Sequence, residues 1–150
     1  MVGDMNWGIS MIWFWTAYIL VTIIGVMHTV FNWKVLKMEI PKDVEFKPSQ
    51  VPAYLKTKPF HVLYNILIFP VFAYIYLKQI APGNLWEEAL IIAISWTVIT
   101  IVIDLIGWVL IKHPWHMTFN EMYIDYQPWI SLIYVTIFVS PFIAAGIIGI

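Results

Sequence analysis

The sequence has 150 residues, of which 61% are hydrophobic and 11% are charged, and its mean hydropathy is +0.81. A soluble domain carries about 25% charged residues, so this composition predicts an integral membrane protein. The formal net charge is −1 and no basic cluster is mixed with aromatic residues, which argues against nucleic acid as a partner. The absence of cysteine excludes disulfides, thiolate metal sites and cysteine nucleophiles.

Four apolar segments are each long enough to cross a bilayer, which takes about 20 residues in a helix. They span approximately residues 9–31, 60–77, 89–111 and 129–148. Short connections favour antiparallel neighbours, so we expect an all-α polytopic membrane protein with four transmembrane helices in an antiparallel bundle. The chain 1–150 is expected to form a single transmembrane domain surrounded by membrane lipids.

The lysines predict the orientation of the bundle. Six of the eight lysines lie in the connection 32–59, and Lys112 marks the connection 112–128. The positive-inside rule therefore places both connections in the cytoplasm, with the N-terminus and the C-terminus outside. All eight basic residues are lysine and isoleucine is abundant, a bias typical of low-GC bacterial genomes. We therefore expect the protein in a bacterial plasma membrane.

Two connections contain strong helix breakers. The connection 32–59 carries four prolines, so we expect it to lie extended across the cytoplasmic face rather than to form one long helix. The second connection is short and contains the breaker sequence Ala81-Pro82-Gly83-Asn84, which predicts a tight turn between antiparallel helices.

The connection 112–128 has the most detailed pattern. A proline after His113 is expected to end the third membrane helix, because the residue before proline is pushed out of the α region. Thr118 and Glu121 then fit a capping box at the start of a short helix at the membrane interface. This helix would present Glu121 and Asp125 on one face, at positions i and i+4.

Asp104 is the carboxylate of this sequence that cannot easily reach water, because it lies inside the apolar run 89–111. A charge at that depth costs about 3 kcal/mol on insertion scales, and such residues usually face a partner or a cavity. Counting about 1.5 Å of rise per residue from the flanking lysines places Asp104, His28 and Asn65 at nearly the same level. Three segments thus contribute a polar side chain at one depth, and His28 is a candidate partner for Asp104.

Polar and small residues recur at helical spacing on three segments, as helix–helix contacts inside a bilayer require. The stripes are Thr22, Gly25, His28 and Asn32; His61 and Asn65; and Thr97, Thr100, Asp104 and Gly107. We expect the stripes to face one another below a cytoplasmic opening. The candidate ligand-binding residues are His28, His61, Asn65, Asp104, His113, His116, Glu121 and Asp125.

Imidazole and carboxylate groups together suit zinc, iron or manganese. The candidate metal ligands are His28, His61, Asp104, His113 and His116. No pair shows a recognised helical metal spacing such as HExxH, so the pattern leaves metal binding open. Facing helices would also allow a haem held between His28 and His61.

The leading interpretation is a small membrane protein that binds an amphiphilic ligand or an ion in a polar cavity facing the cytoplasm. It would act alone, as a homo-oligomer or as a subunit of a larger membrane complex. The alternative is a metal-dependent intramembrane enzyme acting on a lipid-like substrate. Proton relay through Asp104 and His28, transport by a dimer and a helper role without chemistry are further readings. The absence of arginine removes the usual bidentate phosphate clamp.

The stretch HPWHMTFNEMYIDYQPWISLIY, residues 113–134, resembles uncharacterised small four-helix membrane proteins of low-GC Gram-positive bacteria. The resemblance covers about a seventh of the 150 residues. It implies a bacterial source and a helical membrane fold, and it carries no mechanism.

Overall fold

The computed structural model describes residues 5–38, 47 and 50–150, and every regular element within them is helical. Four of the helical segments are long and apolar enough to cross a membrane, with α3 and the π-helix η2 forming one continuous span. The fold class predicted from the sequence is therefore confirmed. In chain order the elements are α1 (Trp7–Lys34), α2 (Pro52–Ile80), α3 (Leu85–Asp104), η2 (Leu105–Leu110), α4 (Phe119–Tyr123) and α5 (Trp129–Ile148).

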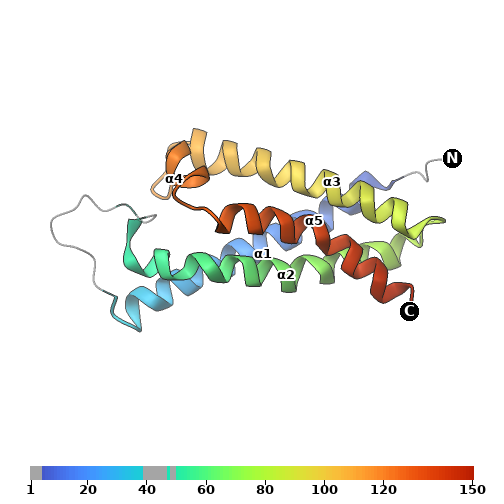
Figure 1. The fold of residues 1–150 in the computed structure, drawn as a ribbon, viewed down its shortest axis with the longest axis horizontal. Coiled ribbons are helices and arrows are strands. Elements are labelled where there is room, and N and C mark those ends of the chain that lie inside the picture. The colour runs from blue at the N-terminus through green and yellow to red at the C-terminus, as the bar shows by residue number, and fades with distance from the viewer. Residues whose placement is uncertain (1–4, 39–46, 48–49) are drawn as a thin grey trace.

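The long helices pack in the order α1, α2, α5, α3, so that α2 and α5 occupy the middle of the bundle. The start of α1 and the end of α5 lie at one end, here called the terminal end, whereas α4, the end of α1 and the start of α2 lie at the other, the connection end (Figure 1). α1 and α3 come together near the terminal end and diverge toward the connection end (Figure 1). This divergence leaves the room in which the candidate site lies.

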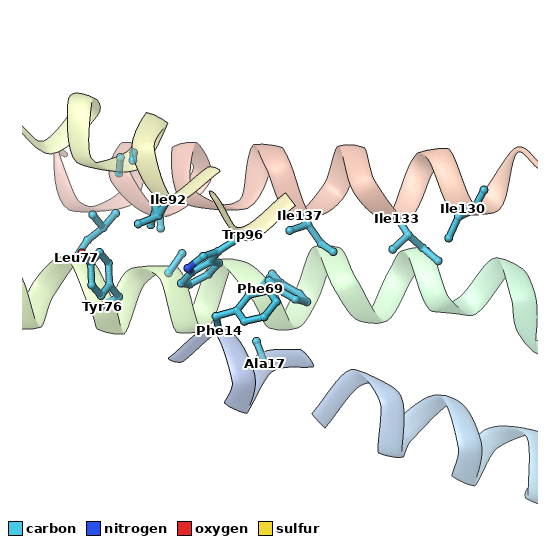
Figure 2. Close-up of a cluster of buried hydrophobic side chains, with 14 of the residues drawn as sticks. Phe14, Ala17, Phe69, Tyr76, Leu77, Ile92, Trp96, Ile130, Ile133 and Ile137 are labelled. Carbon is cyan, nitrogen blue, oxygen red and sulfur yellow. The ribbon is translucent and has the colours of Figure 1, made fainter. Parts of the chain in front are cut away.

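An aromatic cluster closes the terminal half of the bundle. Phe14 of α1, Phe69 of α2 and Trp96 of α3 are fully buried, and their ring centroids lie 6.0–6.3 Å apart (Figure 2). The Trp96 indole Nε1 donates a hydrogen bond to Ser10 Oγ at 3.0 Å, which joins α3 to α1 directly. Close packing and a satisfied indole therefore hold these two helices together here.

Buried hydrogen bonds join α1 to α2 at the connection end. Asn32 Nδ2 donates to the Ala53 carbonyl at 3.3 Å and to Thr57 Oγ1 at 3.1 Å. Thr29 Oγ1 lies 3.3 Å from the same Thr57 hydroxyl. Interhelical hydrogen bonds of this kind take the place of the hydrophobic driving force that lipid removes.

The boundaries of α2 differ from the expectation. The helix begins at Pro52 rather than near residue 60, and Pro59 lies inside it. Proline is favoured in the first turn of a helix, where its missing N–H has no partner to lose, and interior prolines are tolerated in membrane helices. The prediction of an extended chain is therefore wrong for residues 52–59. The rest of that prediction falls largely on residues 39–46 and 48–49, outside the described residues.

The other predicted boundaries agree more closely. α5 spans Trp129–Ile148 as expected, and the turn between α2 and α3 lies at residues 81–84, where Ala81 adopts a left-handed conformation with φ 47°. α1 extends a few residues beyond its predicted range at both ends. The third span starts earlier than predicted because Asn84 caps it, accepting a hydrogen bond from the Glu87 backbone N–H at 3.2 Å.

The capping box predicted for the short helix is present. Glu121 N donates to Thr118 Oγ1 at 3.2 Å, and Thr118 N donates to Glu121 Oε2 at 2.6 Å. α4 ends at Tyr123, however, and Asp125 lies in the turn that follows. The prediction that Glu121 and Asp125 share a helical face is therefore wrong, since the helix stops after five residues.

Candidate ligand-binding cavity

A cavity of about 110 Å³ lies where α1 and α3 diverge. Its walls come from all four membrane segments and from the stretch between η2 and α5. Such a volume accommodates several water molecules or a small organic group. The lining residues are Tyr18, Val21, Thr22, Gly25, Val26, Thr29, Tyr54, His61, Asn65, Thr100, Asp104, Trp108, Trp115, Met117, Met122, Tyr126, Ile130, Ile133 and Ile137.

Asp104 ends α3 at the wall of this cavity and is 6% exposed. The Tyr18 hydroxyl donates to Oδ1 at 2.7 Å, and the Tyr134 hydroxyl donates to Oδ2 at 3.0 Å. The carboxyl group thus connects α1, α3 and α5. No lysine or histidine forms an ion pair with it among the described residues.

The π-helix that follows Asp104 sets the position of Trp108. In η2 the Ile111 N–H bonds to the Ile106 carbonyl, five residues earlier, instead of four. Trp108 lines the cavity, and its indole Nε1 donates to the Tyr18 hydroxyl at 3.3 Å. The irregular turn therefore places an indole beside the pair of Asp104 and Tyr18, and π-helical turns of this kind frequently occur at functional sites.

His61 of α2 forms a second polar point on the cavity wall. Its Nδ1 is hydrogen-bonded to the Tyr126 hydroxyl, while its Nε2 is buried without a hydrogen-bond partner among the described residues. Burial raises the pKa of the Tyr126 phenol well above its ordinary value, as does the nearby Tyr54, so this hydroxyl keeps its proton. A buried polar atom without a partner is rare in native proteins and calls for an explanation such as a bound molecule.

Gly25 of α1 provides the space that the His61 ring occupies. A β-carbon at Gly25 would lie 2.7 Å from His61 Nε2, well inside van der Waals contact. The glycine in the predicted α1 stripe is thus explained by close approach of an imidazole from α2. It also fixes where Nε2 points, toward a residue that itself lines the cavity.

The structure brings together part of the predicted polar set. Thr22 and Gly25 of α1, His61 and Asn65 of α2, and Thr100 and Asp104 of α3 all line the one cavity. The prediction that three polar stripes face one another is confirmed for these residues. The threonine hydroxyls donate to backbone carbonyls within their own helices, and Asn65 Nδ2 donates to the His61 carbonyl at 2.7 Å.

His28 lies outside the cavity. Its Nδ1 is hydrogen-bonded to the Tyr64 hydroxyl, and its ring packs edge-on against Phe60, with 4.8 Å between the centroids. The prediction that His28 pairs with Asp104 is wrong, because the carboxylate is held by tyrosine hydroxyls instead. His28 instead contributes to the packing of α1 on α2.

The histidines of the third connection have structural roles. The Trp115 backbone N–H donates to His113 Nδ1 at 3.1 Å, so His113 Nε2 carries the proton and donates to the Gly107 carbonyl at 2.8 Å. This neutral tautomer satisfies a carbonyl left free where η2 ends. His116 Nδ1 contacts the His113 carbonyl at 3.2 Å. Neither ring lines the cavity.

The two predicted acids of this connection also lie outside the cavity. Asp125 is exposed, and Glu121 closes the capping box, accepts from Gln50 Nε2 at 2.5 Å and lies 4.0 Å from Lys47 Nζ. Burial raises the pKa of the Glu121 carboxyl, but the hydrogen bonds from Thr118 and Gln50 and the charge of Lys47 lower it more, so its pKa lies below the ordinary value. Glu121 is therefore a structural carboxylate.

The candidate metal ligands do not converge. No three histidine, aspartate or glutamate side chains within the described part of the chain lie close enough to hold one metal ion. His28 and His61 each use Nδ1 for a tyrosine hydroxyl, and only His61 lines the cavity, so the pair does not form the facing ligands that a haem between helices requires. The donor set therefore gives no support to a resident metal or haem.

Sequence reasoning missed the tyrosines and the tryptophan that complete the site. Tyr18, Tyr134 and Trp108 contact Asp104 or one another, yet each resembled an ordinary aromatic residue of a membrane helix. One signal was available for Tyr18, which precedes Thr22 and Gly25 at helical spacing and so extends the same α1 stripe. The π-helix that orients Trp108 has no recognisable sequence pattern.

A second buried carboxylate lies at the terminal end. Glu88 of α3 is 4% exposed, and the Tyr76 hydroxyl of α2 donates to its Oε1. Glu88 follows Glu87 in the first turn of α3. Neither residue lines the cavity, and the hydrogen bond joins α2 to α3.

Comparison of the chain with protein-family models, with curated proteins and with solved structures finds no match. The function must therefore be inferred from the cavity itself.

Proposed function

We propose that this membrane protein binds a small amphiphilic molecule in the cavity between α1 and α3, with the polar group of the ligand at Asp104 and His61. One observation carries the proposal: His61 lines the cavity, and its Nε2 is buried without a hydrogen-bond partner among the described residues. Aliphatic and aromatic side chains form most of the remaining lining. Concave, largely apolar sites with a few convergent polar groups are typical of small-molecule binding.

The lysine distribution supports an orientation for the site. The cavity lies toward the connection end, where α1 ends at Lys34, α2 carries Lys56 and Lys58 near its start, and Lys112 follows η2. Under the positive-inside rule this end faces the cytoplasm of a bacterial plasma membrane, with both termini outside. The ligand would then enter from the cytoplasmic leaflet or from the cytoplasm.

Native mass spectrometry of the protein in nanodiscs tests the proposal, with a cavity-filling variant and a matched control. Val26 lines the cavity from α1 and is 38% exposed. Val26→Trp should therefore fill the cavity, and the partly exposed position should accept the larger side chain. Ile23, on the same helix, is 49% exposed and is absent from the lining, so Ile23→Trp introduces the same indole elsewhere. Both variants should fold, because each adds an aromatic side chain at a position partly exposed to lipid.

We expect the wild-type protein and Ile23→Trp to retain a stoichiometric small molecule and Val26→Trp to lose it. Solvent extraction of the wild-type complex then identifies the molecule. Bare protein in every sample, or equal retention by Val26→Trp, would overturn the proposal.

A further inference from the structure

The charge of the cavity lining is unbalanced. Among the described residues that line the cavity, Asp104 is the only one with a formal charge at neutral pH when histidine is neutral, because these residues include no lysine and no other acid. The whole sequence contains no arginine. Charged groups at membrane depth are expensive and are normally paired, so a carboxylate without a cation favours a ligand that supplies one.

The hydrogen bonds to Asp104 suit an ionised carboxylate. Tyr18 and Tyr134 donate to different oxygens, at 2.7 and 3.0 Å, so neither oxygen needs to carry a proton of its own. A carboxylate can accept about four hydrogen bonds, so about two acceptor positions remain for a ligand. The tyrosines orient the group without neutralising its charge.

Aromatic rings surround the space beside this carboxylate. Five aromatic side chains line the cavity, and two methionines add polarizable thioethers. Aromatic faces attract cations, and cages of such rings are a known means of recognising ammonium groups. The rings are Tyr18, Tyr54, Trp108, Trp115 and Tyr126, and the methionines are Met117 and Met122.

Two of these rings already bind a cation of the protein itself. The Lys58 ammonium lies 4.7 Å from the centroid of the Tyr126 ring and 5.8 Å from that of Tyr54. Lys58 itself is not part of the lining. These two rings therefore already interact with an ammonium group.

Other ligand classes fit the lining less well. An anionic head would meet Asp104 without an arginine or lysine in the lining to balance it. A metal ion would lack a third ligand, since no such group of three exists among the described histidines and carboxylates. A neutral head would leave the carboxylate uncompensated at membrane depth.

We propose that the cavity selects an organic cation: an amine or quaternary ammonium group on an apolar body, with its charge at Asp104 and its apolar part against the aromatic wall. This inference rests on the proposed binding function and names the ligand class.

Two water-soluble probes of similar size and opposite charge test the inference on the wild-type protein. Benzyltrimethylammonium carries a tetrahedral cationic head on a benzyl group, and benzylsulfonate carries a tetrahedral anionic head on the same group. Isothermal titration calorimetry in nanodiscs of zwitterionic lipid should show one saturable site for benzyltrimethylammonium and none for benzylsulfonate. No binding of the cation, or equal binding of both probes, would overturn the inference without any substitution.

A charge-removing variant then locates the site. Asp104→Asn should weaken benzyltrimethylammonium binding by about ten- to a hundredfold, the magnitude of one interaction with a charged group. Glu88→Gln removes the other carboxylate that is buried among the described residues and should leave binding unchanged, because Glu88 is absent from the lining. Binding that survives in Asp104→Asn would overturn the inference. If that variant does not fold, the two-probe comparison on the wild-type protein still decides.

The molecule recovered by native mass spectrometry separates the two proposals. A retained cation supports both. A retained neutral or anionic amphiphile, lost in Val26→Trp, would overturn the ammonium inference and leave the binding function intact. If Val26→Trp still retains the adduct and still binds the probe, the cavity is not the binding site.

Discussion

The two halves of the bundle solve the same packing problem differently. In the terminal half, Phe14, Phe69 and Trp96 fill the space between α1, α2 and α3, and the indole of Trp96 bonds directly to Ser10. In the connection half, α1 and α3 are bridged by the hydrogen bond from Tyr18 to Asp104, and a cavity remains beside it. One half is a closed core and the other a polar chamber, although the same helices build both.

The difference follows from side-chain size and from the irregular end of α3. Large rings stand at the helix crossing of the terminal half, whereas the α1 wall of the cavity offers Thr22 and Gly25. The π-helix after Asp104 then alters the face that the third span presents and brings Trp108 to the cavity. Stability of the closed half allows the other half to keep polar groups without protein partners. Functional sites often lower local stability in this way, and the rest of the protein compensates.

The largest expected contrast comes from one substitution made in each half. Ile92 is fully buried in the terminal half, and Ile133 is 8% exposed and lines the cavity. Ile92→Ala should cost about 2–5 kcal/mol of unfolding free energy, because it opens a new void in a closed core. Ile133→Ala should lie at the low end of that range, since the space beside it is already open. Unfolding by denaturing detergent, followed by circular dichroism, measures both; equal losses would contradict the contrast.

The two buried carboxylates give the next contrast. Tyr76→Phe removes a donor to Glu88 at a site with no adjoining cavity, and should cost about 1.5–3 kcal/mol, the magnitude for a hydrogen bond to a charged group. Tyr18→Phe removes one of two donors to Asp104, where water or ligand in the cavity can replace it. The same unfolding assay should therefore show the smaller loss for Tyr18→Phe. A larger loss for Tyr18→Phe would show that the cavity does not supply a replacement partner.

A third contrast uses glycine. Gly25→Ala would place a β-carbon 2.7 Å from His61 Nε2, so the imidazole must move and strain its hydrogen bond to Tyr126. We expect a loss of about 1–3 kcal/mol, as is usual for overpacking. In Gly146→Ala the β-carbon meets nothing within 4 Å, so this helical substitution should be neutral or stabilising by about 0.5–1 kcal/mol. Thermal unfolding in detergent compares the two, and equal stability would show that His61 has room to yield.

The sequence predicted the helical fold and the depth at which polar residues meet. It predicted the contacts within the site less well. Periodicity and depth placed His61, Asn65 and Asp104 together, because small and polar residues on membrane helices turn toward other helices. The same argument failed for His28. This residue lies where α1 packs against α2, and its imidazole is hydrogen-bonded to the Tyr64 hydroxyl of α2. Which of two interhelical faces a residue joins depends on helix rotation, and spacing alone does not determine it.

The remaining parts of the site depend on local backbone events and on ambiguous residue types. Tyrosines at membrane depth serve equally as packing residues and as hydrogen-bond donors, so Tyr18 and Tyr134 gave no distinctive signal. The π-helix arises in Leu105–Leu110, an apolar run that is compatible with an ordinary α-helix. The connection that follows packs against this turn, and Met117 N donates to the Trp108 carbonyl at 2.7 Å.

The smallest expected effect concerns Glu121, which fixes the connection beside the cavity rather than the cavity itself. Its pKa in the folded protein lies below the ordinary value of 4.5, so the folded state favours the ionised form. Its contribution to stability is therefore complete above the ordinary pKa and is lost as the pH falls through the lower folded value. Glu121→Gln should remove this dependence and cost about 1 kcal/mol at neutral pH, the magnitude of a helix cap. Thermal unfolding of both proteins between neutral and acidic pH should show the difference between them shrinking as the pH falls. If the difference in stability between the two proteins does not change with pH, the amide replaces the carboxylate in the capping box. The negative charge of Glu121 beside Lys47 then contributes nothing to stability.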